Sequence, residues 1–184
     1  MKSVNGALKF NGISKLSAFE ISNKLRNNEL KLEDVINHFI DRIKNYNHSL
    51  KVFKFFDEKI IFDELDFYNG FQKKSSNLLG IPIGVKDIFN TIHMTNSMGS
   101  KIYEKYLPGN DARVVFDTRR NGGIIFGKTY SSEFAVHNPA PTKNPWDLKL
   151  SPGTSSAGSA VAVATRMVPI TIGSQTAGSI IRPA

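Results

Sequence analysis

Residues 151–164 read SPGTSSAGSAVAVA, a loop of small and polar residues that runs directly into an alanine- and valine-rich segment. The loop composition is typical of a turn, and the segment after it predicts a helix over 156–166. A helix start offers unpaired N–H groups and the positive end of the helix dipole, which suit an anion or an oxyanion. A flexible loop or an ordinary helix cap would explain the same composition equally well.

The residues beyond this helix form an apolar run over 168–173 and then the small-residue segment GSQTAGSIIRPA at 173–184. The apolar run predicts a buried strand, and the segment after it predicts a turn. A serine hydroxyl on such a turn lies beside a row of backbone N–H groups, which is what the nucleophile of an acyl transfer needs. Taken alone, an ordinary strand-ending turn is the simpler interpretation.

Upstream of this region, short apolar runs alternate with helical patterns. We expect strands over 80–87 and 124–127, with a helix between them over 111–121. That helix should begin with Asp111 as its N-cap and bury Val114 and Val115 on its apolar face. The alternation of strands and helices predicts an α/β fold with a sheet covered by helices.

The first part of the chain is expected to be helical. Ser17 and Glu20 have capping-box spacing, which predicts a helix over 17–27. A second, amphipathic helix is predicted by apolar residues at helical spacing: Leu32, Val35, Ile36, Phe39, Ile40 and Ile43. We expect it to end near 45–47. We expect a strand over 51–56, a helix over 57–68 and a polar loop over 69–79.

Lys86 ends the apolar run of the expected strand over 80–87. Lysine is almost never fully buried without a partner, and burial would lower its pKa and make it a base. A lysine that reaches solvent or pairs with Asp87 is the alternative.

The chain has four histidines, His38, His48, His93 and His137. We expect His38 and His48 on the surface, and His93 and His137 lie in loops without an evident carboxylate partner. None is favoured as a catalytic base.

Residues 122–129, GGIIFGKT, match the spacing of a phosphate-binding P-loop. The bulky Ile124, Ile125 and Phe126 lie where such a loop needs a backbone cradle, so a strand is the better interpretation.

The composition of the chain excludes some classes of protein. Apolar residues make up 40% of the chain, and the absence of cysteine excludes a disulfide framework and a cysteine nucleophile. The net charge of +8 comes from lysines and arginines scattered among acidic residues, which is typical of a solvated surface. We see no signal peptide and no apolar stretch of membrane-spanning length, and we expect a cytoplasmic protein.

Several segments together resemble the amidase signature family of serine amidases. They occur in the family's order and are GIPIGVKD (80–87), DARVVFDTRRNGGIIFGKTYSSEFA (111–135), PTKNPWD (141–147), SPGTSSAGSAVAVA (151–164) and VPITIGSQTAGSIIRPA (168–184). The resemblance covers about residues 14–184. It implies a single, incomplete amidase domain over 1–184, with a lead-in over 1–13, a helical region over 14–70 and the start of the α/β core over 80–184. The fold class is then α/β, with a mixed sheet of which only the N-terminal portion is present.

The resemblance also implies roles for individual residues. The family uses a Ser–cisSer–Lys triad, whose members match Ser179 as nucleophile, Ser155 as proton relay and Lys86 as base. It places the oxyanion hole on the backbone N–H groups of Thr176, Ala177, Gly178 and Ser179. Ser156 and Thr154 would support these residues, and the Thr154–Ser155 peptide bond would be cis.

The implied activity is hydrolysis of a carboxamide C–N bond in a linear, small-molecule amide through an acyl-enzyme, with no cofactor and no metal. A component of a tRNA-dependent amidotransferase that hydrolyses glutamine is one alternative, and only in that case do we expect contact with nucleic acid. An inactive, truncated product is another alternative, since a full family domain is more than twice this long. We expect no membrane partner, and a homo-oligomer stays open.

Three positions depart from a common form of the family's motifs. Gln175 replaces an aspartate, and Ala177 and Thr154 stand where glycine is common. These departures favour a stand-alone amidase over a component of an amidotransferase. We expect the 184-residue chain alone to be inactive and poorly stable, with an exposed edge at its last strand.

Overall fold

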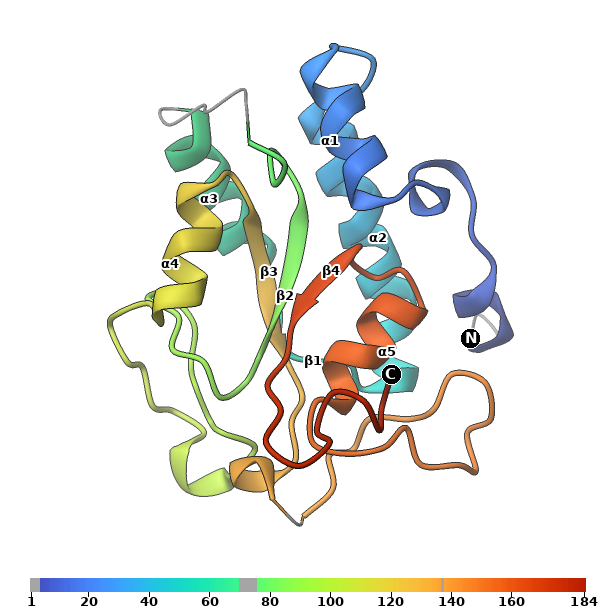
Figure 1. The fold of residues 1–184 in the computed structure, drawn as a ribbon, viewed down its shortest axis with the longest axis vertical. Helices are drawn as coiled ribbons and strands as arrows, with labels where there is room; N and C mark the ends of the chain where they lie inside the picture. The colour runs from blue at the N-terminus through green and yellow to red at the C-terminus, as the bar shows by residue number, and fades with distance from the viewer. Residues whose placement is uncertain (1–3, 70–75, 137) are drawn as a thin grey trace.

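The computed structural model describes residues 4–69, 76–136 and 138–184. These residues fold around a mixed sheet in the strand order β1-β3-β2-β4 (Figure 1). The strands are β1 (Phe53–Phe55), β2 (Pro82–Lys86), β3 (Ile124–Thr129) and β4 (Ile170–Ile172). β2 runs parallel to both β3 and β4, whereas β1 is antiparallel to β3. The predicted α/β class with a mixed sheet is confirmed.

Helices flank the sheet on both sides (Figure 1). On one side lie α3 (Glu58–Asn69) and α4 (Arg113–Arg120), and on the other α1 (Ala18–Arg26), α2 (Leu32–Leu50) and α5 (Ala157–Ala164). Short 3₁₀ helices cover Val4–Leu8, Gly12–Lys15, Lys101–Tyr103 and Glu133–Ala135. Among the described residues, no helix has both the length and the apolarity that crossing a bilayer requires.

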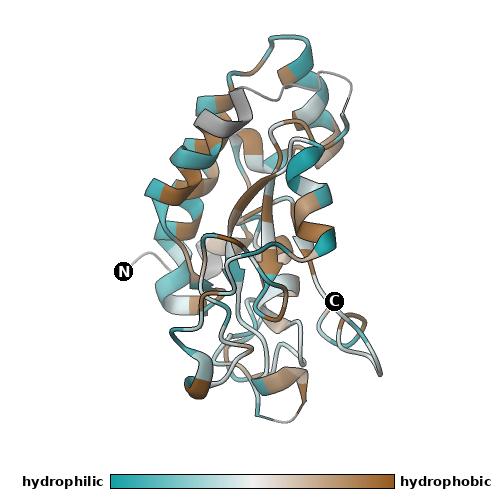
Figure 2. Cartoon of the chain, turned by 90° about the vertical axis from the view of Figure 1, so that its left-hand side faces the viewer, coloured by the Kyte–Doolittle hydropathy of each residue, from teal (hydrophilic) through white to brown (hydrophobic). Residues whose placement is uncertain are grey.

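The first two long helices form where the sequence predicts them. Ser17 caps α1, and the capping box with Glu20 is complete. The apolar stripe of α2 is buried, but the helix continues to Leu50 and ends where Lys51 adopts a left-handed conformation with φ 52°. Figure 2 shows the result, with hydrophobic strands at the centre and hydrophilic residues mainly on the outer faces of the helices.

The start of α4 differs from the prediction. Ala112, not Asp111, occupies the N-cap position. The Asp111 carboxylate instead accepts a hydrogen bond from Ile92 N–H at 2.8 Å and pairs with Arg119 at 2.9 Å, so a tertiary contact replaces the local cap. Val115 is buried as expected, but Val114 is 41% exposed, because consecutive residues on a helix point about 100° apart.

β3 runs through most of the segment that resembles a P-loop. The residues from Ile124 to Thr129 pair with β2 along their length, so they form no phosphate cradle. The interpretation of this segment as a strand is confirmed. The register places Lys86 opposite Thr129, so the carboxyl ends of β2 and β3 meet. The described residues between 138 and 153 form no regular element. His137 and residues 70–75 of the expected loop lie outside the described residues.

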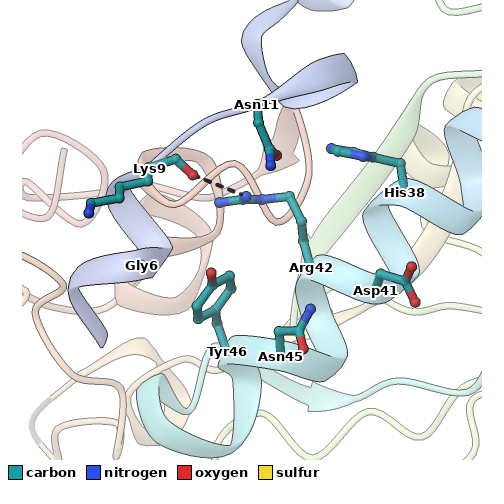
Figure 3. A pocket seen from close by; sticks show the side chains of 8 residues that line it. All are labelled: Gly6, Lys9, Asn11, His38, Asp41, Arg42, Asn45 and Tyr46. Carbon is teal, nitrogen blue, oxygen red and sulfur yellow. Dashed lines mark hydrogen bonds between the residues drawn. The ribbon is translucent and has the colours of Figure 1, made fainter. Parts of the chain in front are cut away.

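Arg42 joins α2 to the end of α5. Its guanidinium donates to the backbone carbonyls of Ala7 at 2.9 Å and Thr165 at 2.6 Å, and it makes cation–π contacts with the rings of Phe10 and Tyr46. Figure 3 shows it beside a cavity of about 350 Å³. His38 lines this cavity and is half-buried, so the prediction of a surface position is only partly right.

Candidate active site

Lys86 ends β2 and is fully buried. Its Nζ donates hydrogen bonds to Ser155 Oγ at 2.7 Å and Ser174 Oγ at 2.9 Å. Burial lowers the pKa of Lys86 from 10.5 to about 8, since a low-dielectric site disfavours the ammonium. The neighbouring Asp87 pairs with Lys128 instead, so the alternative of a Lys86–Asp87 pair is not what the fold forms.

Ser155 is held in place just before α5. The Thr154–Ser155 peptide bond is cis, as the family resemblance implies. The Ser155 carbonyl accepts a hydrogen bond from Ser132 N–H at 3.2 Å. The first turn of α5 can approach the end of β3 because residue 158 is glycine, where a Cβ would lie 2.6 Å from both N and O of Tyr130.

Ser156 connects this region to the segment after β4. Its N–H donates to the Ser179 carbonyl at 3.1 Å, and its hydroxyl donates to the Ser174 carbonyl at 3.0 Å. Ser174, which the sequence motifs do not single out, contacts Lys86 directly through its hydroxyl. The only signal in the sequence is its place as the first serine after the apolar run of β4.

Ser179 lies in the turn that follows β4 and is half-buried. Within the described part of the chain, its hydroxyl forms no hydrogen bond with Lys86 or Ser155. The structure therefore brings Lys86 and Ser155 together, whereas Ser179 is joined to this region through its carbonyl, which accepts from Ser156 N–H.

The backbone around Ser179 has free donors. The N–H groups of Thr176, Ala177, Gly178 and Ser179 donate no hydrogen bond to any residue that the structure describes. The side chain of Gln175 accepts from the next N–H groups, those of Ile180 at 3.0 Å and Ile181 at 2.9 Å. The amide oxygen of Gln175 therefore serves as the acceptor at the position where the common motif has a carboxylate.

This arrangement can move protons and stabilise negative charge. A buried amine with a lowered pKa can accept a proton from the hydroxyl that it touches. Unpaired N–H groups on a neighbouring turn can receive an oxyanion. His48 and His93 are exposed and His38 lines the cavity beside Arg42, so none of these three contacts Lys86.

Comparison with known proteins gives consistent matches. The family model named Amidase matches residues 34–184. One relative is the A component of a glutamyl-tRNA(Gln) amidotransferase from Clostridium acetobutylicum, which is 35% identical over 179 residues, a match that covers 92% of this chain and 37% of the relative. The corresponding protein of Coxiella burnetii is 38% identical over 173 residues, and the match covers 90% of this chain and 36% of that protein.

Solved structures share the fold. Native peptide amidase from Stenotrophomonas maltophilia superimposes with a TM-score of 0.83 at 27% identity, covering 92% of this chain and 38% of that chain. The 6-aminohexanoate cyclic dimer hydrolase reaches a TM-score of 0.85 at 24% identity, which shows the fold alone. The chain thus spans a little over a third of the length of the proteins it matches.

Proposed function

This chain belongs to the Amidase family, and from that premise we propose that it hydrolyses a carboxamide C–N bond through an acyl-enzyme on Ser179. The observation that carries the proposal is the hydrogen bond of 2.7 Å between the fully buried Lys86 amine and the Ser155 hydroxyl. A lysine held in this way has both the geometry and the pKa of a general base.

The proposed reaction uses a two-serine relay. Neutral Lys86 accepts the Ser155 proton while Ser155 accepts the Ser179 proton, and Ser179 Oγ attacks the amide carbon. The N–H groups of residues 176–179 stabilise the resulting oxyanion. The relay then returns the proton to the leaving amine as the C–N bond breaks, and water hydrolyses the ester by the same route. With a pKa of about 8, roughly a tenth of Lys86 is neutral at pH 7.

Labelling with a fluorophosphonate, which reacts with activated serines, tests this proposal in the protein that carries the chain. We expect one adduct, on Ser179, that Ser179→Ala abolishes and Ser155→Ala strongly slows. The exposed Ser151 lies outside the proposed relay, so Ser151→Ala is the matched control and should label like the parent. Equal labelling of Ser179→Ala and the parent would show that the nucleophile is misassigned.

Glutamine hydrolysis within a tRNA-dependent amidotransferase is the second candidate. The observation in its favour is the 35% to 38% identity to curated relatives of that name, against 27% for the peptide amidase. Release of ammonia from glutamine, together with copurification of partner proteins, would support this candidate. Release of ammonia from a C-terminally amidated peptide, in the absence of partner proteins, would support a stand-alone amidase. We also propose a cytoplasmic location, which fits a sequence without cysteine.

A further inference from the structure

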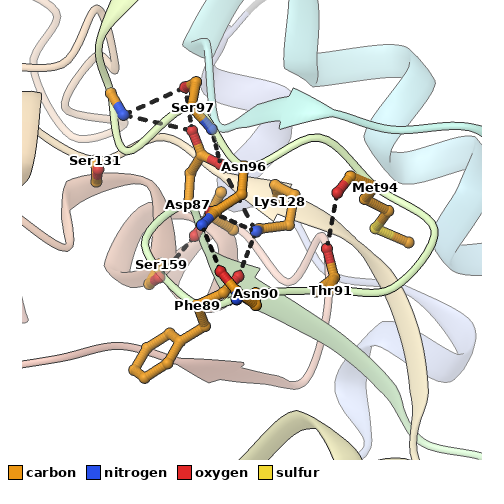
Figure 4. A network of polar contacts seen from close by, with 12 residues as sticks. Asp87, Phe89, Asn90, Thr91, Met94, Asn96, Ser97, Lys128, Ser131 and Ser159 are labelled. Atoms are coloured by element: carbon orange, nitrogen blue, oxygen red, sulfur yellow. Dashed lines mark hydrogen bonds and ion pairs between the residues drawn. The ribbon is translucent and has the colours of Figure 1, made fainter. Parts of the chain in front are cut away.

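A second lysine, Lys128, is fully buried at the end of β3. Its Nζ donates to Asn96 Oδ1 at 2.9 Å and to the Phe89 carbonyl, and it lies 3.7 Å from Asp87 Oδ1 (Figure 4). The proposed reaction uses neither Lys128 nor Asp87. Removing two charges from water is costly unless they are paired and hydrogen-bonded. We therefore asked which part of the structure the buried Asp87–Lys128 pair stabilises.

The Asp87 carboxylate fixes the loop that follows it. It accepts hydrogen bonds from Ser97 N–H at 3.1 Å and Gly99 N–H at 3.5 Å, and from the Ser97 hydroxyl. Gly99 has φ +73° and lies directly against the Ser132 carbonyl, where a Cβ would come within 2.8 Å of the oxygen. The 97–99 loop therefore supports the turn that contains Ser132.

That turn leads back to the candidate site. Ser132 N–H donates to the Ser155 carbonyl at 3.2 Å, and the Ser155 hydroxyl accepts from Lys86. Lys86 is the chain neighbour of Asp87, so the contacts form a closed ring. The ring runs from Asp87 through the 97–99 loop and Ser132 to Ser155 and Lys86.

At pH 7 the charges of Asp87 and Lys128 balance, because burial lowers the pKa of Lys128 only to about 8 and its ammonium form still predominates. An unpaired carboxylate next to Lys86 would favour the ammonium form of the lysine, whereas the Lys128 ammonium cancels that field. Other ionisable groups that interact with the pair are Asp111, before α4, and Tyr130, after β3.

We propose that Asp87 and Lys128 are positioning residues, which hold Ser155 against the Lys86 amine and keep that amine available as a base. The inference rests on the proposed function only for the role of Lys86.

Titration of Lys86 tests the inference without any need for turnover. Lysine labelled with ¹³C at Cε reports the midpoint of its own protonation by NMR. We compare the parent with Lys128→Met, Asp87→Asn and the double variant. Lys24→Met, which breaks the exposed ion pair of Lys24 and Glu29 near α1, is the control and should leave the midpoint unchanged.

The expected midpoint of the parent is about 8. Lys128→Met should raise it by about one pH unit, because the carboxylate is left uncompensated, and Asp87→Asn should lower it. The double variant, which lacks both charges, should return toward the parent value. A midpoint that neither single variant moves, or that the double variant fails to restore, overturns the inference.

Should Lys128→Met fail to fold, the direction of the Asp87→Asn shift decides alone. The proposed function and this inference are refuted by different results. Absence of Ser179 labelling refutes the function and leaves the midpoints valid, and unmoved midpoints refute the pair's role even in an active amidase.

Discussion

The Lys86→Met variant should differ from the parent in unfolding free energy by an amount that depends on pH. Lys86 is fully buried, and burial lowers its pKa to about 8 from 10.5. Methionine has a similar shape and no charge. The substitution therefore removes the unfavourable free energy of a charged group in the interior, together with the hydrogen bonds to Ser155 and Ser174.

The sign follows from proton binding. Between pH 8 and 10.5, the unfolded chain holds a proton on Lys86 that the folded chain has already released. Raising the pH through this window therefore stabilises the parent relative to the variant. With about 1.4 kcal/mol per pKa unit, the difference should change by about 2 to 3 kcal/mol between pH 7 and pH 10. The lost hydrogen bonds should add an offset that is nearly independent of pH, so the slope is the informative quantity.

Urea unfolding followed by circular dichroism at pH 7, 8, 9 and 10 measures this difference. All other titrating groups are common to both proteins and cancel. Lys15 is exposed, so Lys15→Met is the matched control and should give a difference that stays constant over the same range. A constant difference for Lys86→Met as well would refute the claim that the buried amine has a lowered pKa.

Two further substitutions probe the scaffold around the site. Arg42→Met should lower the unfolding free energy by about 3 kcal/mol in urea, because buried carbonyls lose their donor, whereas the exposed Arg120→Met should change it by less than about 0.5 kcal/mol. Gly158→Ala should destabilise the protein by about 1–3 kcal/mol and slow serine labelling, since its Cβ would meet the backbone of Tyr130; a neutral effect would show that α5 can shift freely.

The sequence predicts those features that depend on local chemistry. The capping box at Ser17, the apolar stripe of α2 and the strand over the false P-loop all follow from spacing within a few residues. The burial of Lys86 could be expected because the lysine ends an apolar run. The pairing of Lys86 with Ser155 came from the family resemblance, since no spacing rule brings residues so far apart in the sequence together.

Features that depend on tertiary contact were missed. Asp111 has the sequence context of a helix cap, but Arg119 and the Ile92 N–H bind its carboxylate instead. The contact between Lys86 and Ser174 depends on how the segment after β4 returns to β2. The Asp87–Lys128 pair depends on the register of β2 and β3, which a single sequence does not reveal.

The rate of fluorophosphonate labelling of Ser179, measured against pH in the parent and in Lys86→Met, tests the central claim most directly. If Lys86 activates Ser179 through Ser155, the parent rate should rise with pH around a midpoint of about 8. Lys86→Met should label far more slowly at every pH and show no such midpoint. A variant that labels as fast as the parent, or a parent rate that is flat from pH 6 to pH 10, would contradict the account.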